Sequence, residues 1–176
     1  MNEYKLVFTG TTGAGKTTAI SAISEIAPIN TDVENSDTSF NKPSTTVGFD
    51  YGQITLANGD RVRLFGTPGQ MRFDFMWKIL VKDAFGLIIL IDNSRPDPLA
   101  DLDIYLDGFS REIQHIPCAI GVGRTDIFTT PSLDDYSARL AYYGFIFPVL
   151  PVDVRKVNDV AMLVEVLMLQ AEADLT

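Results

Sequence analysis

The sequence predicts an α/β fold in which helices cover both faces of one mostly parallel sheet. Short apolar runs alternate with segments of helical spacing along nearly the whole chain, a pattern typical of parallel strands joined by helices. One pair of runs instead flanks Asn58-Gly59, the dipeptide that most strongly marks a tight hairpin. We therefore expect a single three-layer domain over residues 1–176, with a six-stranded sheet that has one antiparallel edge strand, and about five helices.

The expected strands are β-prone or continuously apolar runs bounded by turns. The run at Phe85–Ile91 is the longest apolar one, so it is expected to be a buried strand, and it is too short to cross a bilayer. The two runs beside Asn58-Gly59 should pair antiparallel. The expected strands are Tyr4–Thr9, Val47–Leu56, Arg61–Phe65, Phe85–Ile91, Cys118–Val122 and Phe145–Val152.

The expected helices carry apolar residues at every third or fourth position. In the third helix Leu99, Leu102 and Leu106 fall on one face, and Gly144 ends the fourth. The stretch Asn30–Ser44 is rich in Ser, Thr, Asn and Asp, so we expect an exposed loop there. The expected helices are Gly15–Ile26, Phe73–Lys82, Leu99–Ile113, Leu133–Tyr143 and Val157–Glu172.

The composition of the chain argues against several classes of function. With 46% hydrophobic and 21% charged residues the chain is globular, and its net charge of −9 opposes polyanionic surfaces. We therefore expect no nucleic-acid binding and no insertion into a membrane. The sequence shows no secretory or lipidation signal, and its one cysteine, Cys118, cannot form an internal disulfide. The cytoplasm is the expected location.

Residues 10–17 form the most informative motif of the chain. They read Gly-Thr-Thr-Gly-Ala-Gly-Lys-Thr and fit G-x-x-x-x-G-K-[ST], between a predicted strand and a predicted helix. In such a loop the backbone N–H groups and the helix N-terminus face a phosphate anion. Lys16 would reach the β- and γ-phosphates, and the Thr17 hydroxyl would hold Mg²⁺. The predicted phosphate-binding residues are Gly10, Thr11, Thr12, Gly13, Ala14, Gly15, Lys16, Thr17 and Thr18.

Four further segments lie in loops beside the predicted strands. They are Thr45-Thr46 before the second strand, Phe65-Gly66-Thr67-Pro68-Gly69-Gln70 after the third, Gly123-Arg124-Thr125-Asp126 after the fifth and Val152-Asp153-Val154-Arg155 after the sixth. With the phosphate loop, their order and spacing resemble the Ras-like small GTPases over nearly the whole chain. Within that superfamily they look closest to the bacterial gliding-motility (Mgl-type) group. The resemblance implies a P-loop NTPase fold, GTP and GDP with Mg²⁺ as ligands, slow GTP hydrolysis, and signalling through two nucleotide-sensitive loops.

The resemblance assigns roles around the γ-phosphate. Thr46, with Thr45 as the alternative, would ligate Mg²⁺ and sense the γ-phosphate. Gly69 would donate its backbone N–H to the γ-phosphate, and Gln70 would orient the attacking water. A catalytic arginine would come from Arg72 or from a partner, although Arg72 is equally well explained as a surface residue at a helix start.

One position departs from the pattern. Gly66 stands where most of the superfamily has an Asp linked to Mg²⁺, although the Mgl-type group also tends to lack it. Because Mg²⁺ prefers carboxylate ligands, Asp50 on the neighbouring predicted strand could supply one through water, and Asp92 is the other candidate.

The resemblance also places base recognition in the last two segments. The Asp126 carboxylate can accept hydrogen bonds from N1–H and the N2 amine of guanine, which adenine does not offer. Arg124 replaces the usual Lys and could pack over the base, whereas Gly123 replaces the usual Asn. In the last segment, the Val154 backbone N–H would reach guanine O6, and Asp153 lies beside Val154 in the sequence.

Met71–Trp77 is unusually apolar for a loop, so part of it is either buried or exposed as a partner surface. The resemblance implies a regulator, such as a dimer of roadblock fold, and an effector, both bound through segments 44–50 and 67–78. Two other functions stay open. A P-loop ATPase or small kinase would use Asp92 as its metal acid, and a nucleotide-bound scaffold would hydrolyse little.

Overall fold

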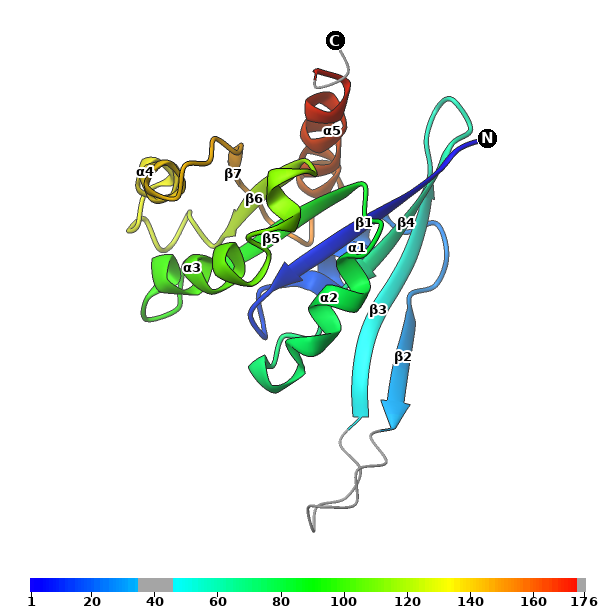
Figure 1. Ribbon diagram of the computed structural model, residues 1–176, viewed down its shortest axis with the longest axis horizontal. Coiled ribbons are helices and arrows are strands. Elements are labelled where there is room, and N and C mark those ends of the chain that lie inside the picture. The colour runs from blue at the N-terminus through cyan, green and yellow to red at the C-terminus, as the bar shows by residue number, and fades with distance from the viewer. Residues whose placement is uncertain (35–45, 174–176) are drawn as a thin grey trace.

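A seven-stranded sheet runs through the centre of the molecule (Figure 1). The computed structural model describes the backbone of residues 1–34 and 46–173 and the side chains of residues 1–29 and 48–173. The strands lie in the order β2-β3-β4-β1-β5-β6-β7. They span β1 Glu3–Gly10, β2 Ile29–Glu34, β3 Thr46–Thr55, β4 Arg61–Gly66, β5 Gly86–Asp92, β6 Cys118–Gly123 and β7 Val149–Pro151.

The parallel part of the sheet comprises β4, β1, β5, β6 and β7. β3 pairs antiparallel with β4 through the hairpin that Asn58-Gly59 predicts. The predicted α/β fold with a mostly parallel sheet is therefore confirmed.

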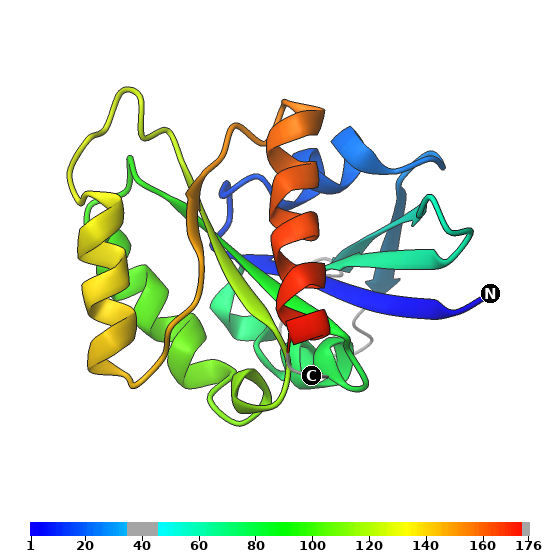
Figure 2. The ribbon, with the colours of Figure 1, turned by 90° about the horizontal axis from the view of Figure 1, so that it is seen from above.

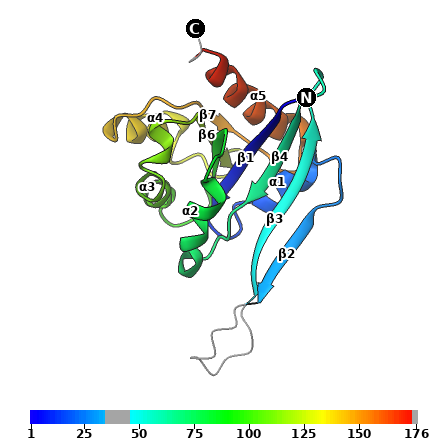
Figure 3. The ribbon, with the colours of Figure 1, turned by 45° about the vertical axis from the view of Figure 1, so that its right-hand side comes forward.

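The strand β2 corrects the expected count of six strands and the expected position of the antiparallel strand. β2 pairs antiparallel with β3 at the edge of the sheet, so β3 lies one place inward (Figure 3). The expected loop was Asn30–Ser44, because its composition is polar; residues 30–34 of it form β2, and residues 35–44 lie outside the described residues. An edge strand is held by backbone hydrogen bonds to one neighbour and needs no apolar alternation, which explains the error. The last strand is also shorter than expected, since β7 is confined to Val149–Pro151.

In the part of the chain that the structure describes, five α-helices pack on the two faces of the sheet, which confirms the predicted three layers. They are α1 Lys16–Ile23, α2 Phe75–Val81, α3 Pro98–Gly108, α4 Leu133–Tyr142 and α5 Val157–Ala173. Short 3₁₀ turns, η1 Met71–Phe73 and η2 Glu112–Gln114, precede α2 and follow α3, so the helix expected over 99–113 ends early. Among the described helices, none is long and apolar enough to cross a membrane.

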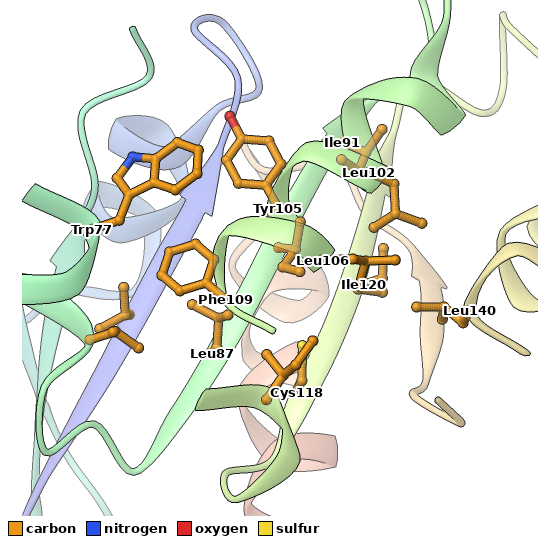
Figure 4. Packing of buried hydrophobic residues seen from close by; sticks show 14 of the residues in the cluster. Trp77, Leu87, Ile91, Leu102, Tyr105, Leu106, Phe109, Cys118, Ile120 and Leu140 are labelled. Carbon is orange, nitrogen blue, oxygen red and sulfur yellow. The ribbon is translucent and has the colours of Figure 1, made fainter. Parts of the chain in front are cut away.

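Successive residues of β5 divide between two hydrophobic cores, because side chains alternate across a strand. Leu87, Ile89 and Ile91 pack with α2, α3 and α4, around the aromatic residues seen in Figure 4. Ile88 and Leu90 pack on the other face with α1 and α5, and Figure 2 shows α5 lying across the strands there. With both faces covered, the carboxyl ends of the parallel strands are left as the place where loops can form a site.

Candidate functional site

The loop between β1 and α1 has the close backbone contacts that its glycines allow. A Cβ atom on Gly10 would lie 2.3 Å from the carbonyl oxygen of Leu90, and one on Gly15 would lie 2.6 Å from a methyl carbon of Val154. Both glycines also have positive φ angles, which side chains rarely tolerate. The loop is therefore fitted against β5 and the segment after β7 in a form that only glycine permits.

Lys16 begins α1 and is buried within the same loop. Its ammonium nitrogen donates to the carbonyl oxygens of Gly10, at 2.5 Å, and Thr11, at 2.9 Å. Burial lowers the pKa of Lys16 to about 8, against the opposing effect of the Asp50 carboxylate. The cation thus lies inside the loop, at the place where a phosphate group would be surrounded by backbone amides.

Thr17 and Asp50 meet beside this loop. The Thr17 hydroxyl donates to the Asp50 carboxylate at 2.6 Å. Asp50 lies directly across the β3–β4 ladder from Gly66, and a Cβ atom on Gly66 would lie 3.2 Å from Oδ2 of Asp50. The carboxylate of Asp50 therefore lies beside Gly66, the position at which the resemblance predicts an Asp.

This pair of oxygen groups suits Mg²⁺, which prefers hard oxygen ligands and keeps several waters. No cluster of three or more His, Cys, Asp or Glu side chains that could hold a metal occurs among the described residues. Of the two switch threonines, Thr46 begins β3 but its side chain is not described, and Thr45 lies outside the described residues.

Gly69 lies against the phosphate loop at the opposite side. A Cβ atom placed on it would lie 2.7 Å from the backbone nitrogen of Thr12. The next residue, Gln70, is exposed, and its side-chain oxygen accepts a hydrogen bond of 2.8 Å from Nε of Arg72. The guanidinium of Arg72 also lies 4.7 Å from the centre of the Phe73 ring. The structure thus brings Gln70 and Arg72 into contact beside Gly69.

A pocket of about 650 Å³ extends from the phosphate loop toward the loops after β6 and β7. It brings together many of the predicted ligand-binding residues from separate elements. Those on its wall are Gly13, Ala14, Gly15, Thr18, Arg124, Asp126, Asp153 and Val154. The other described site residues that the sequence predicts are not on its wall, namely Gly10, Thr11, Thr12, Lys16, Thr17, Asp50, Gly69, Gln70 and Arg72.

The comparisons with known proteins agree with a nucleotide pocket. A family profile described as "Conserved hypothetical ATP binding protein" matches residues 8–130, from the end of β1 to beyond Asp126. The chain belongs to this family. The uncharacterized protein MJ1339 of Methanocaldococcus jannaschii is 28% identical over 127 residues, which cover 72% of this chain and 73% of that protein.

In this family member Arg124 does not lie free over the pocket. It has a positive φ angle, and its guanidinium donates to the carboxylate of Asp92, which ends β5. Burial acts to raise the pKa of Asp92, but hydrogen bonds from Ser94 and Arg124 outweigh it and hold the pKa below its ordinary value. Asp92 therefore has protein partners for both of its oxygens at the base end of the pocket, away from Thr17.

The segment after β7 leaves one amide available. Backbone N–H groups of Val152, Asp153, Arg155 and Lys156 donate to acceptors within the protein. The N–H of Val154 has no acceptor in the part of the chain that the structure describes. Arg155 forms two side-chain hydrogen bonds with the carboxylate of Asp153, which lowers the pKa of that carboxyl. Asp153 thus supports the turn that carries Val154.

Two residues that the sequence analysis did not identify, Asn93 and Tyr136, lie behind the pocket. Asn93 directly follows β5 and donates to carbonyl oxygens of Phe128 and Pro131, and Tyr136 of α4 donates to Asn93. We call residues 124–131 the base loop, and these bonds the Asn93 network. A polar residue at the carboxyl end of a buried strand was the available signal for Asn93. Tyr136 had none, since its spacing fits an ordinary core position.

The apolar segment after Gln70 is divided between core and surface. Phe73 and Trp77 are buried, whereas Met71, Phe75 and Ile79 are 49%, 55% and 60% exposed. These three exposed residues recur every fourth position and so form a stripe along η1 and α2. An exposed apolar stripe therefore follows Gln70 along the chain.

Proposed function

We propose that this chain binds a purine nucleoside triphosphate with Mg²⁺ and hydrolyses it, with GTP as the preferred substrate. The observation that carries the proposal is that the phosphate loop and the two predicted base-reading segments line one pocket. Family membership supports nucleotide binding.

The residues around Lys16 would bind the phosphates and Mg²⁺. Its ammonium group, already held inside the loop by two carbonyl oxygens, would move only slightly to reach β- and γ-phosphate oxygens. Thr17 would ligate Mg²⁺ directly, with Thr46 as the second protein ligand, and Asp50 would accept from a metal-bound water. Mg²⁺ there would neutralise charge that develops on the phosphates.

The preference for guanine rests on complementary hydrogen bonding. Asp126 offers an acceptor and Val154 offers an unpaired backbone donor on the wall of the same pocket. Guanine presents N1–H and an N2 amine as donors and O6 as an acceptor, which matches both groups. Adenine has an amine in place of O6, so its donor would face the Val154 donor.

Hydrolysis would use Gln70 to orient the attacking water, while the Gly69 amide contacts the γ-phosphate. Arg72 holds Gln70 through a hydrogen bond, so we propose that it assists in cis by positioning Gln70. Kinetics of Arg72→Ala, with and without a partner protein, separate this role from that of an arginine supplied by a partner.

The γ-phosphate distinguishes the triphosphate from the diphosphate state, so loops that touch it would report the nucleotide to partners. We propose a switch that presents segments 44–50 and 67–78 to a regulator and an effector. The Ras-like and Mgl-type relationship, the roadblock-fold regulator and the cytoplasmic location stay predictions.

A second candidate is an ATPase or small kinase, which the description of the family favours. In that case adenine would bind in a different pose, with its amine donating to Asp126 and with no acceptor on the base for the Val154 N–H. A scaffold that retains its nucleotide without hydrolysis is the third.

Competition between GTP and ATP for the purified protein, with Mg²⁺ present, tests the proposal. We expect GTP to bind at least tenfold tighter than ATP, and Asp126→Asn to remove most of that difference. Tighter ATP binding would establish the second candidate, and failure to bind either nucleotide would refute the proposal. Single-turnover hydrolysis then separates an enzyme from a scaffold.

A further inference from the structure

The base loop, residues 124–131, is exposed over most of its length. Asp126, Ile127, Phe128 and the next two residues are all exposed, and Ile127 is 73% exposed. Within the loop, only a short turn in which the amides of Ile127 and Phe128 donate to the Arg124 carbonyl provides local structure. A loop with so few local contacts needs support from elsewhere to hold Asp126 in one place.

Asn93 provides that support from the sheet. Its side-chain amide donates to the carbonyl oxygens of Phe128, at 2.6 Å, and Pro131, at 3.0 Å. Its backbone N–H donates to the carbonyl of Gly123, at 3.1 Å, directly before the loop. One residue at the end of β5 therefore contacts the loop at its start, middle and end. With 2% of its surface exposed, Asn93 makes these bonds shielded from water.

Tyr136 fixes the orientation of Asn93. The Tyr136 hydroxyl donates to the side-chain oxygen of Asn93 at 2.6 Å, and the Tyr136 side chain is fully buried. With this bond, both ends of the Asn93 amide are paired. An amide rotated by half a turn would direct its NH₂ group toward the hydroxyl and its oxygen toward two carbonyls, which is unfavourable. The helix that carries Tyr136 is itself anchored at its start by a reciprocal capping box between Ser132 and Asp135.

Asp92, the residue before Asn93, contacts the same loop from the pocket side. Its carboxylate accepts from Arg124, the first residue of the loop, and from Ser94. Two consecutive residues at the end of β5 thus hold both sides of the loop that carries Asp126. Gly123, where the resemblance places a polar Asn, supplies a carbonyl but no side chain.

We infer that Asn93 and Tyr136 are positioning residues for base recognition. Neither side chain is on the pocket wall, and both act by holding Asp126 at the geometry in which it reads the base. The inference rests on the proposed nucleotide binding, but it makes a separate statement about the loop. On this inference, the preference for one base depends on residues at the end of β5 and in α4, which lie outside the segment that would touch the base.

The test removes one oxygen atom. Tyr136→Phe deletes the hydroxyl that orients Asn93 and keeps the buried ring. The matched control is Tyr105→Phe, since Tyr105 is equally buried and its hydroxyl has no hydrogen-bond partner among the described residues. Each protein is titrated with GTP, with ATP and with inorganic tripolyphosphate, which binds the phosphate loop without a base.

We expect Tyr136→Phe to weaken GTP binding about tenfold, to reduce the preference over ATP, and to leave tripolyphosphate binding unchanged. Tyr105→Phe should change none of the three. Equal losses for GTP and tripolyphosphate would mean a general structural defect and would overturn the inference, as would unchanged GTP binding.

Hydrogen exchange of the nucleotide-free protein tests the positioning role of Asn93 and Tyr136 separately from the proposed nucleotide binding. Exchange at the amides of Ile127 and Phe128 should be faster in Tyr136→Phe than in the wild type and in Tyr105→Phe. If exchange accelerates but no protein binds GTP or ATP, the network holds the loop and the proposed function fails. If the wild type binds GTP and exchange is unchanged, the positioning role is wrong.

Discussion

The two ends of the proposed nucleotide site, the base end in the pocket and the γ-phosphate end at Gly69 and Gln70, are built from different kinds of interaction. At the base end, buried polar side chains from β5 and α4 hold the base loop through bonds with paired donors and acceptors. At the γ-phosphate end, the Thr67 hydroxyl forms a buried hydrogen bond of 2.7 Å with the Thr9 hydroxyl. Among the described residues after Thr67, the stretch that carries Gly69 and Gln70 has one buried side-chain bond, from the indole N–H of Trp77 to the carbonyl of Pro68 at 3.3 Å. Trp77 in turn stacks on Tyr105 and Phe109 of the α3 region (Figure 4).

This difference indicates which end can move. Hydrogen bonds are directional, and a buried group that loses its partner costs free energy, so the base end has one favourable arrangement. Stacked aromatic rings tolerate small displacements, and one long hydrogen bond is easily exchanged. The exposed stripe of Met71, Phe75 and Ile79 lies on the movable side, where a change of conformation would alter what a partner meets. The predictions below test this division, from the largest expected effect to the smallest.

Replacing Lys16 with Ala should weaken the binding of every nucleotide, because on the proposed function its cation would contact the phosphates that all nucleotides share. We expect triphosphate affinity to fall about 100-fold, the loss typical of a hydrogen bond to a charged group. Isothermal titration of GTP and tripolyphosphate measures it, and both should weaken alike. Lys156→Ala is the control, since Lys156 lies on the wall at the base end and should change affinity little. Loss of GTP binding alone would place Lys16 away from the phosphates.

Replacing Gln70 with Ala should affect only the γ-phosphate end. Single-turnover hydrolysis should slow on the order of 100-fold, because the attacking water loses its orientation, while GTP affinity stays unchanged. Gln114→Ala is a matched control, since Gln114 is an exposed glutamine in the turn after α3. Its side-chain amide donates to the carbonyl oxygen of Ser110. A rate equal to the wild type would remove Gln70 from the mechanism.

Replacing Asp50 with Asn should raise the Mg²⁺ concentration needed for half-maximal strengthening of GTP binding about tenfold. A loss of this size is usual when a group that orients a metal ligand is altered. Thr17 can still donate to the amide oxygen, so the fold should be kept. The measurement is GTP affinity across an Mg²⁺ titration, with a second titration in chelator where the variant and wild type should agree. Asp126→Asn should leave the midpoint for Mg²⁺ unchanged, and an unchanged midpoint in Asp50→Asn would exclude Asp50.

The sequence was sufficient wherever a local pattern determines the structure. The phosphate loop was identified because its glycines, Lys16 and Thr17 are contiguous, and the closeness of Asp50 and Gly66 followed from the hairpin at Asn58-Gly59. Alternation of strands and helices predicted the layers for the same reason.

The remainder depends on contacts between distant residues. Tyr136 and Asn93 are 43 positions apart, and each by itself looks like an ordinary helix or turn residue. Arg124 is predicted to pack over the base because it replaces the usual Lys, and its pairing with the carboxylate of Asp92, 32 positions away, could not be read from the sequence. Strand β2 was missed because its pairing with β3 uses the backbone, which has no sequence signature.

The smallest effect should come from Trp77, which is also the most direct reporter of the movable end. Trp77→Phe keeps an aromatic ring against Tyr105 and Phe109 and removes one neutral hydrogen bond to Pro68, so unfolding in urea should lose about 1 kcal/mol. Hydrolysis should slow only a few-fold, because Gln70 itself is kept.

In the wild type the one tryptophan of the chain can show whether the two ends differ as proposed. Its indole N–H bonds the residue before Gly69, so its emission should shift between complexes with GDP and with a non-hydrolysable GTP analogue. Exchanging guanine for adenine at equal phosphate number should leave the emission unchanged, because the base loop is held by Asp92 and Asn93 at the end of β5, whereas Trp77 bonds Pro68. If the Trp77 emission changed with the base and not with the γ-phosphate, the base end would be the movable one and the γ-phosphate end the rigid one.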